Sequence, residues 1–152
     1  MENKNFSEEI SEFLSTIFRQ AQLEMEFECH AEEEVVSIEL SGPDASLIVR
    51  ENGRVLYAIN HILNRAFYTD QGPRRSIMVD CNQYRASRAE ELRQLAQRAA
   101  EAVKRSGNHL SLEPMPAGER RVVHLALAEE PGVFTESEGI GLNRRVVVLP
   151  AK

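Results

Sequence analysis

The sequence lacks tryptophan and is poor in aromatic side chains. It has three tyrosines and six phenylalanines among 152 residues. Proteins that hold single strands mainly by stacking bases on aromatic rings usually carry more of them. The sequence also lacks an apolar run of 18 residues, and its first residues lack the charged-then-apolar order of a signal peptide. We therefore expect a cytoplasmic protein that does not insert into a membrane.

Cysteine and histidine are scarce, and neither has the spacing of a metal site. Cys29 and Cys81 lie far apart and lack the C-x-x-C pattern of zinc sites. Each occupies an apolar position of an expected strand, which favours a buried, reduced thiol. No glycine-rich phosphate loop, nucleophile elbow or paired catalytic carboxylates are visible. We expect no metal, no cofactor and no catalytic residue.

Positive charge is also in short supply. The net charge of −6 argues against nucleic acid as a partner, but the acidic residues are concentrated near the N-terminus. Residues 1–45 carry twelve acidic and two basic side chains, whereas residues 46–152 carry twelve acidic and sixteen basic ones. A basic face in the later part of the chain is therefore compatible with the composition.

Apolar residues recur with helix or strand periodicity along most of the chain, which indicates an α+β fold. Residues 7–22 are expected to form an amphipathic helix, and residues 23–29 and 36–40 an antiparallel hairpin. The later elements are expected at 45–49 (helix), 54–67 (helix), 76–81 (strand), 83–106 (helix), 118–129 (helix), 133–138 (strand) and 144–149 (strand). Gln-Gly-Pro at 71–73 and Glu-Pro-Met-Pro at 113–116 mark breaks. We assign one domain to residues 7–112 and a second to residues 113–152.

A helix followed by strand, strand, helix, loop, helix and strand is the element order of a type II KH domain, a three-stranded sheet with helices on one face. In that fold a tight loop between two helices clamps nucleic-acid backbone. The loop here is Arg50-Glu51-Asn52-Gly53, and we take Arg50, Asn52, Gly53 and Arg54 as candidate contacts. The usual G-x-x-G pattern has lost its first glycine to Arg50, and Glu51 adds negative charge. The alternative is a helical corner that binds no ligand.

A second constellation lies at 119–124, Glu-Arg-Arg-Val-Val-His. Arg120 and His124 are four residues apart and therefore share one face of the expected helix. Together these side chains can contact phosphate and stack on a base. The same pattern occurs by chance as an ordinary surface pair. It indicates a binding site only when the surrounding sequence supports one.

That context is a resemblance, over roughly 110 residues, to the bacterial Jag (SpoIIIJ-associated) family, which joins a KH domain to an R-three-H domain. The most specific segments are ERRVVHLAL at 119–127, TESEG at 135–139 and RRVVV at 144–148. Earlier segments at 54–64, 79–85, 95–105 and 112–115 occur in the same order. The family's separate N-terminal Jag domain has no counterpart in this sequence, so we expect an architecture without it.

The resemblance implies a non-catalytic protein that binds single-stranded RNA, and in some members a link to cell elongation or division. Arg120 and His124 match the pair that names the R-three-H domain, and Arg144 and Arg145 match a basic pair on the last strand. With Arg121, these residues complete the expected nucleic-acid contacts.

Two other interpretations stay open. One is a protein-interaction adaptor whose degenerate KH loop no longer binds RNA. The other is an RNA-processing enzyme that uses His124 as general acid or base, which the lack of a placed partner carboxylate disfavours. The sequence does not decide between RNA and single-stranded DNA, nor whether there is a protein partner or a homodimer.

Overall fold

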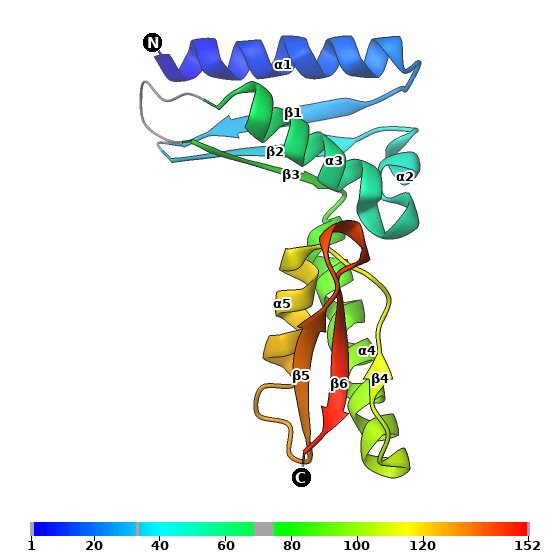
Figure 1. Ribbon diagram of the computed structural model, residues 1–152. Helices are drawn as coiled ribbons and strands as arrows, with labels where there is room; N and C mark the ends of the chain where they lie inside the picture. Colours follow the sequence, from blue (N-terminus) through cyan, green and yellow to red (C-terminus); the bar gives the residue numbers. More distant parts are fainter. Residues whose placement is uncertain (1, 33, 69–74, 152) are drawn as a thin grey trace. The chain divides into compact units, whose positions relative to one another are not determined.

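The computed structural model describes residues 2–32, 34–68 and 75–151 (Figure 1). The chain forms two compact units, Met1–Arg85 and Ala86–Lys152. Each unit has its own three-stranded sheet and its own apolar core. Within the described ranges, no helix has the length and apolar character needed to cross a membrane.

The first unit is a mixed sheet with helices. Its elements are α1 (Glu2–Gln20), β1 (Glu26–Ala31), β2 (Val35–Ser41), α2 (Ala45–Ile48), α3 (Arg50–Ala66) and β3 (Ser76–Cys81). The strand order is β1-β2-β3, in which β2 runs antiparallel to β1 and parallel to β3. A parallel pair needs a crossover connection, and α2 and α3 supply it.

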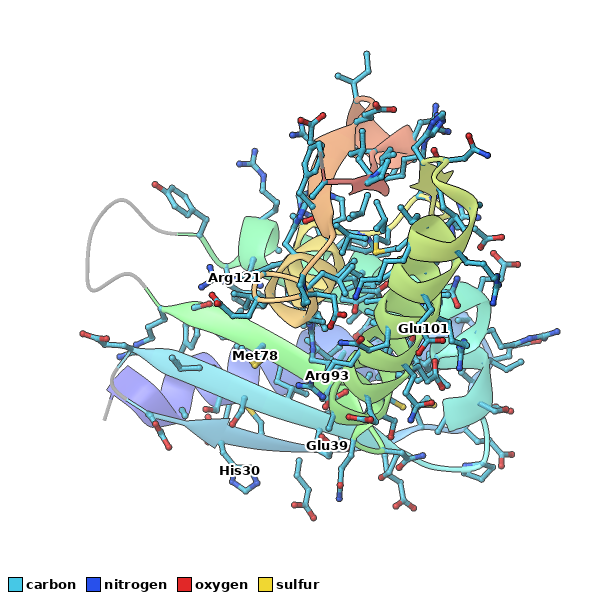
Figure 2. All side chains as sticks on the ribbon, turned by 90° about the horizontal axis from the view of Figure 1, so that it is seen from below. His30, Glu39, Met78, Arg93, Glu101 and Arg121 are labelled. Atoms are coloured by element: carbon cyan, nitrogen blue, oxygen red, sulfur yellow. The ribbon has the colours of Figure 1, made fainter. Side chains whose placement is uncertain are left out.

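Alternation along the strands explains why only one face of this sheet is covered. Val36, Ile38 and Leu40 of β2 lie beside Ile77, Val79 and Cys81 of β3, and all six are buried in one cluster with the apolar stripe of α1. The residues between them point to the other face. Figure 2 shows His30, Glu39 and Met78 on that open face, where the register also aligns Glu28, Glu39 and Asp80 in a row.

The second unit packs two helices against an antiparallel sheet. Its elements are α4 (Tyr84–Ser106), β4 (Leu110–Ser111), α5 (Ala117–Ala126), β5 (Val133–Glu138), the 3₁₀ turn η1 (Gly141–Asn143) and β6 (Arg145–Pro150). The strand order is β4-β6-β5. Gly107 ends α4 in the left-handed conformation, and its N–H donates to the Val103 carbonyl at 2.8 Å.

The predicted α+β class, the three-stranded sheet of the first unit and the antiparallel hairpin are confirmed. The division of the chain differs: the sequence predicts a boundary between residues 112 and 113, whereas the compact units meet at Arg85 and Ala86. The reason is the apolar stripe of α4. Leu92, Ala96 and Val103 are buried with residues of α5 and β6, so most of this helix belongs to the second unit.

Two smaller predictions have different outcomes. Cys81 is a buried free thiol, as expected, and burial followed by the charges of Glu39 and Asp80 raises its pKa. By contrast, Cys29 was expected to be buried too but is only partly buried in β1. The predicted break at 71–73 lies outside the described residues.

Candidate functional site

Residues 51–53, which lie within the bounds of α3, form a tight left-handed turn that separates α2 from the helical part of α3. Glu51, Asn52 and Gly53 have φ values of 50°, 57° and 73°, and the Gly53 N–H donates to the Val49 carbonyl at 3.1 Å. Glycine adopts this conformation freely, whereas glutamate adopts it only with strain. Arg50, where the glycine of the G-x-x-G pattern is missing, has no positive φ. The positions of this turn that favour glycine are therefore 51–53.

Packing explains why the last of these positions is glycine. A Cβ atom on Gly53 would lie 2.6 Å from Cε1 of the Tyr84 ring, so no side chain fits without displacing that ring. Asn52 and Arg50 are exposed beside it. Arg54 is exposed too, but its guanidinium donates to the Glu51 carboxylate at 3.2 Å. This ion pair lowers the positive charge that the turn offers to a phosphate.

Side chains occupy the outer edge of β3. Asn64 forms hydrogen bonds with both the N–H (3.0 Å) and the carbonyl (2.6 Å) of Ile77. Asn60 accepts from the Val79 N–H at 2.8 Å, and Arg85 Nε donates to the Val79 carbonyl at 2.8 Å. The backbone groups that an edge strand normally presents to a ligand are thus already bonded within the unit.

In the second unit, α5 and β5 hold the Arg120–His124 pair in a hydrogen-bonded network. His124 Nδ1 lies 2.6 Å from Thr135 Oγ1, and His124 Nε2 lies 2.8 Å from Ser137 Oγ. Arg120 Nη1 donates to the same Ser137 oxygen at 3.4 Å, while Nε donates to the Met115 carbonyl at 3.3 Å. The predicted shared helical face is confirmed, because both side chains meet Ser137.

The environment of His124 favours the neutral imidazole. Burial, and then the positive charge of Arg120, lower its pKa from the ordinary value of 6.5. A neutral ring has one donor and one acceptor nitrogen, and a hydroxyl can partner either of them. At neutral pH His124 therefore orients the strand hydroxyls, and the positive charge of the pair resides on Arg120.

A buried ion pair fixes the start of α5. Glu119 is 4% exposed, and its two carboxylate oxygens each accept from the Arg88 guanidinium of α4 at 3.3 Å. The Arg88 side chain is only 15% exposed. This two-point contact orients the first turn of the helix, which places the neighbouring Arg120 and Arg121.

The remaining arginines of the expected site are exposed. Arg121, labelled in Figure 2, lies on α5. Arg145 lies opposite Glu138 in the β5–β6 register, and Arg144 precedes it, so successive side chains point to opposite faces. Ser137 pairs with the buried Val146, which puts Arg144 on the α5 side by alternation. None of these three arginines forms an ion pair with another described residue.

The predicted contacts therefore form two groups. The turn group (Arg50, Asn52, Gly53 and Arg54) lies in the first unit, and the hairpin group (Arg120, Arg121, His124, Arg144 and Arg145) lies in the second. The backbone ties the hairpin group together, because the Met115 N–H donates to the Arg144 carbonyl at 3.1 Å. Sequence reasoning missed Thr135 and Ser137, although their alternation with Glu136 and Glu138 signals an inward-facing polar pair.

Comparison with known proteins gives this second unit a class. Residues 90–150 match the R-three-H domain family, so the chain contains an R-three-H domain.

The chain is also homologous to proteins named RNA-binding protein KhpB. It is 29% identical to the Clostridium symbiosum protein over 139 residues, which cover 90% of this chain and 63% of that protein. It is 32% identical to the Bacillus subtilis protein over 115 residues, covering 74% and 55%. It is 26% identical to a Streptococcus pneumoniae protein over 140 residues, covering 92% and 43%. The chain thus spans less than two thirds of the length of each of these relatives.

Proposed function

We propose that this chain binds single-stranded nucleic acid without catalysis, RNA in preference to DNA, and that the hairpin group is its main contact surface. The observation that carries the proposal is the network in which Ser137 joins Arg120 and His124. The same unit adds three exposed arginines, of which Arg144 lies on the α5 side. Guanidinium groups form charge-assisted hydrogen bonds with phosphate. The relatives are named RNA-binding proteins, which supports RNA as the ligand.

The first unit is the acidic half of the molecule. Residues 1–85 carry fifteen acidic and eight basic side chains, whereas residues 86–152 carry nine and ten. A polyanion is repelled by the first surface more than by the second. This distribution favours the hairpin group over the turn group as the electrostatic contact.

We further propose that the first unit is a KH-like domain with a weakened loop. Its element order, its β2–β3 parallel pair and the tight turn at 51–53 support that assignment. Two features reduce its own affinity for nucleic acid. Glu51 partly neutralises Arg54, and the edge of β3 is occupied by side chains.

The test is fluorescence anisotropy with a labelled single-stranded RNA, compared with DNA of the same sequence and with a duplex. A variant in which Arg121, Arg144 and Arg145 are all alanine should lose affinity. Each lost phosphate contact on a single strand should also lower the slope of log affinity against log salt by about 0.7, hence by about 2 for all three. The matched control is Arg105→Ala, an exposed arginine in the last turn of α4.

The outcome that contradicts the proposal is equally clear. If wild-type protein binds none of the three oligonucleotides at low salt, the chain is not a nucleic-acid-binding protein. If the triple variant binds as tightly as the control does, the hairpin group is not the contact surface, and the turn group becomes the next candidate.

A further inference from the structure

The turn that joins β5 to β6 carries two aliphatic side chains that are almost fully exposed to solvent. Ile140 is 84% exposed and Leu142 is 91% exposed, whereas no other large apolar side chain in the described ranges exceeds 64%. A single exposed aliphatic residue is ordinary on a protein surface. Two on one short turn, almost free of intramolecular contact, form a candidate contact surface for a ligand.

The turn is ordered by its own backbone. The Asn143 N–H donates to the Ile140 carbonyl at 3.2 Å, and the Arg144 N–H donates to the Gly141 carbonyl at 3.3 Å. Gly139 has a φ of 86°, and a Cβ there would come within 2.7 Å of the Asn143 carbonyl oxygen. The two aliphatic side chains are therefore presented by a defined turn, which lowers the entropy cost of binding through them.

Positive charge lies immediately beside these side chains. Arg144 and Arg145 follow the turn directly, and the Met115 N–H bonds to the Arg144 carbonyl. Arg120 in turn donates to the Met115 carbonyl. The first turn of α5 and the β5–β6 turn lie at the same end of this unit (Figure 1). A ligand with an anionic backbone and flat apolar faces, such as a single nucleic-acid strand, matches this pairing of guanidinium and aliphatic groups.

The second unit has no aromatic side chain at this end. Phe134 is the single Phe, Tyr or Trp between residues 86 and 152. It is the second residue of β5, opposite Leu149, and lies on the face away from Thr135. Four residue steps along the strand, roughly 13 Å, separate Phe134 from Glu138 at the turn. Nucleic-acid-binding proteins also use isoleucine and leucine as wedges between bases, so aliphatic residues can supply the base contact here.

We propose that Ile140 and Leu142 insert between neighbouring bases of a single strand whose phosphates are held by Arg144 and Arg145. This inference rests on the proposed function and adds the site at which bases are contacted. Because the contact is apolar, it requires no particular base. Its contribution to affinity is independent of salt, unlike that of the arginines.

The test uses the full chain and a double variant, Ile140→Ser with Leu142→Ser. The probes are a single-stranded RNA that contains 2-aminopurine, which brightens when its neighbours unstack, and an abasic strand of the same length. Wild-type protein at saturation should raise the fluorescence and prefer the RNA to the abasic strand. The double variant should do neither and should bind the RNA about tenfold or more weakly, with the salt slope unchanged. Met78→Ser removes an exposed apolar side chain from the open sheet face and serves as control.

Three results would overturn the inference, and they are distinguishable. If the double variant keeps both the fluorescence rise and the wild-type affinity, the insertion of Ile140 and Leu142 is refuted and the proposed function still stands. If the wild-type protein binds no oligonucleotide, the insertion and the proposed function are both refuted. Wild-type protein that binds anionic phosphatidylglycerol vesicles more tightly than RNA, and loses that binding in the double variant, identifies the turn as a membrane-surface contact instead.

Discussion

The buried pair of Arg88 and Glu119 gives the sharpest stability prediction. Glu119→Gln leaves the enclosed Arg88 guanidinium without the carboxylate that accepts two of its hydrogen bonds. Removing one partner of a buried pair costs about 3–5 kcal/mol. Arg88 keeps a contact with the exposed Glu91 at 3.1 Å, so the expected loss for the second unit lies at the lower end, about 3 kcal/mol.

A double-mutant cycle separates the pair from its parts. Arg88→Met with Glu119→Leu removes both charges together, and this variant should fall within about 1–2 kcal/mol of wild type, since well-packed apolar replacements of buried pairs are often neutral. The control pair is Arg93 and Glu90, 3.1 Å apart on the exposed side of α4. Breaking it should cost less than about 1 kcal/mol.

The assay is urea unfolding followed by far-UV circular dichroism and by NMR signals of the second unit. All three tyrosines lie in residues 1–85, so tyrosine fluorescence reports the first unit and should be unaffected. If Glu119→Gln costs no more than the Glu90 control, the argument from burial is refuted. Since Glu119 sets the start of α5, the folded variant should also bind RNA more weakly through a displaced Arg120.

Three further predictions follow from the same geometry. Gly53→Ala combines a left-handed backbone with a clash against a ring, so it should destabilise the first unit by about 2–4 kcal/mol; Gly107→Ala, at a φ of 70° in open space, should cost only about 1 kcal/mol. Glu51→Gly relieves the backbone strain at this position, so urea unfolding should show about 1 kcal/mol of added stability. The same change removes the ion pair of Arg54, and an unchanged salt slope of RNA binding would exclude the turn as a contact. The pKa of His124 is lowered, so its contribution to stability is complete above pH 6.5 and is lost as the pH falls through the lowered value; NMR titration should give a pKa below 6.5, and a higher value would contradict the network.

Local periodicity was sufficient to locate most helices and strands, because each element follows the spacing of its own apolar residues. The parallel pairing of β2 with β3 was not predictable in the same way, since it depends on contacts between residues far apart in the chain. The division into compact units was hidden from sequence for a related reason. The apolar stripe of α4 shows that the helix is covered on one side, but not which residues cover it.

The candidate site was predicted in part. The spacing of Arg120 and His124 indicates a shared helical face. The structure adds that both side chains contact the hydroxyl of Ser137. The buried state of Glu119 was hidden from sequence, because charged residues are rarely enclosed and its partner is 31 positions away. At the turn, sequence comparison draws attention to the missing glycine at position 50, whereas the strained conformation is at Glu51.

The occupied edge of β3 has a consequence for self-association. A strand at the border of a sheet acts as a template on which a further strand, from another copy or from an unfolded chain, can grow. Here Asn60, Asn64 and Arg85 already satisfy the outward-facing groups of Ile77 and Val79. An incoming strand would have to break these bonds first, so this border resists domain swapping and fibril-like addition.

The opposite border, β1, is protected by different means. Two of its three exposed residues are Glu26 and Glu28, which alternate with partly buried apolar side chains. Charges along an edge discourage a second strand from pairing there. Hydrogen bonds at the β3 edge and charged side chains at the β1 edge thus disfavour the addition of a further strand to this sheet. A homodimer, if this protein forms one, is expected to use a surface other than the edges of this sheet.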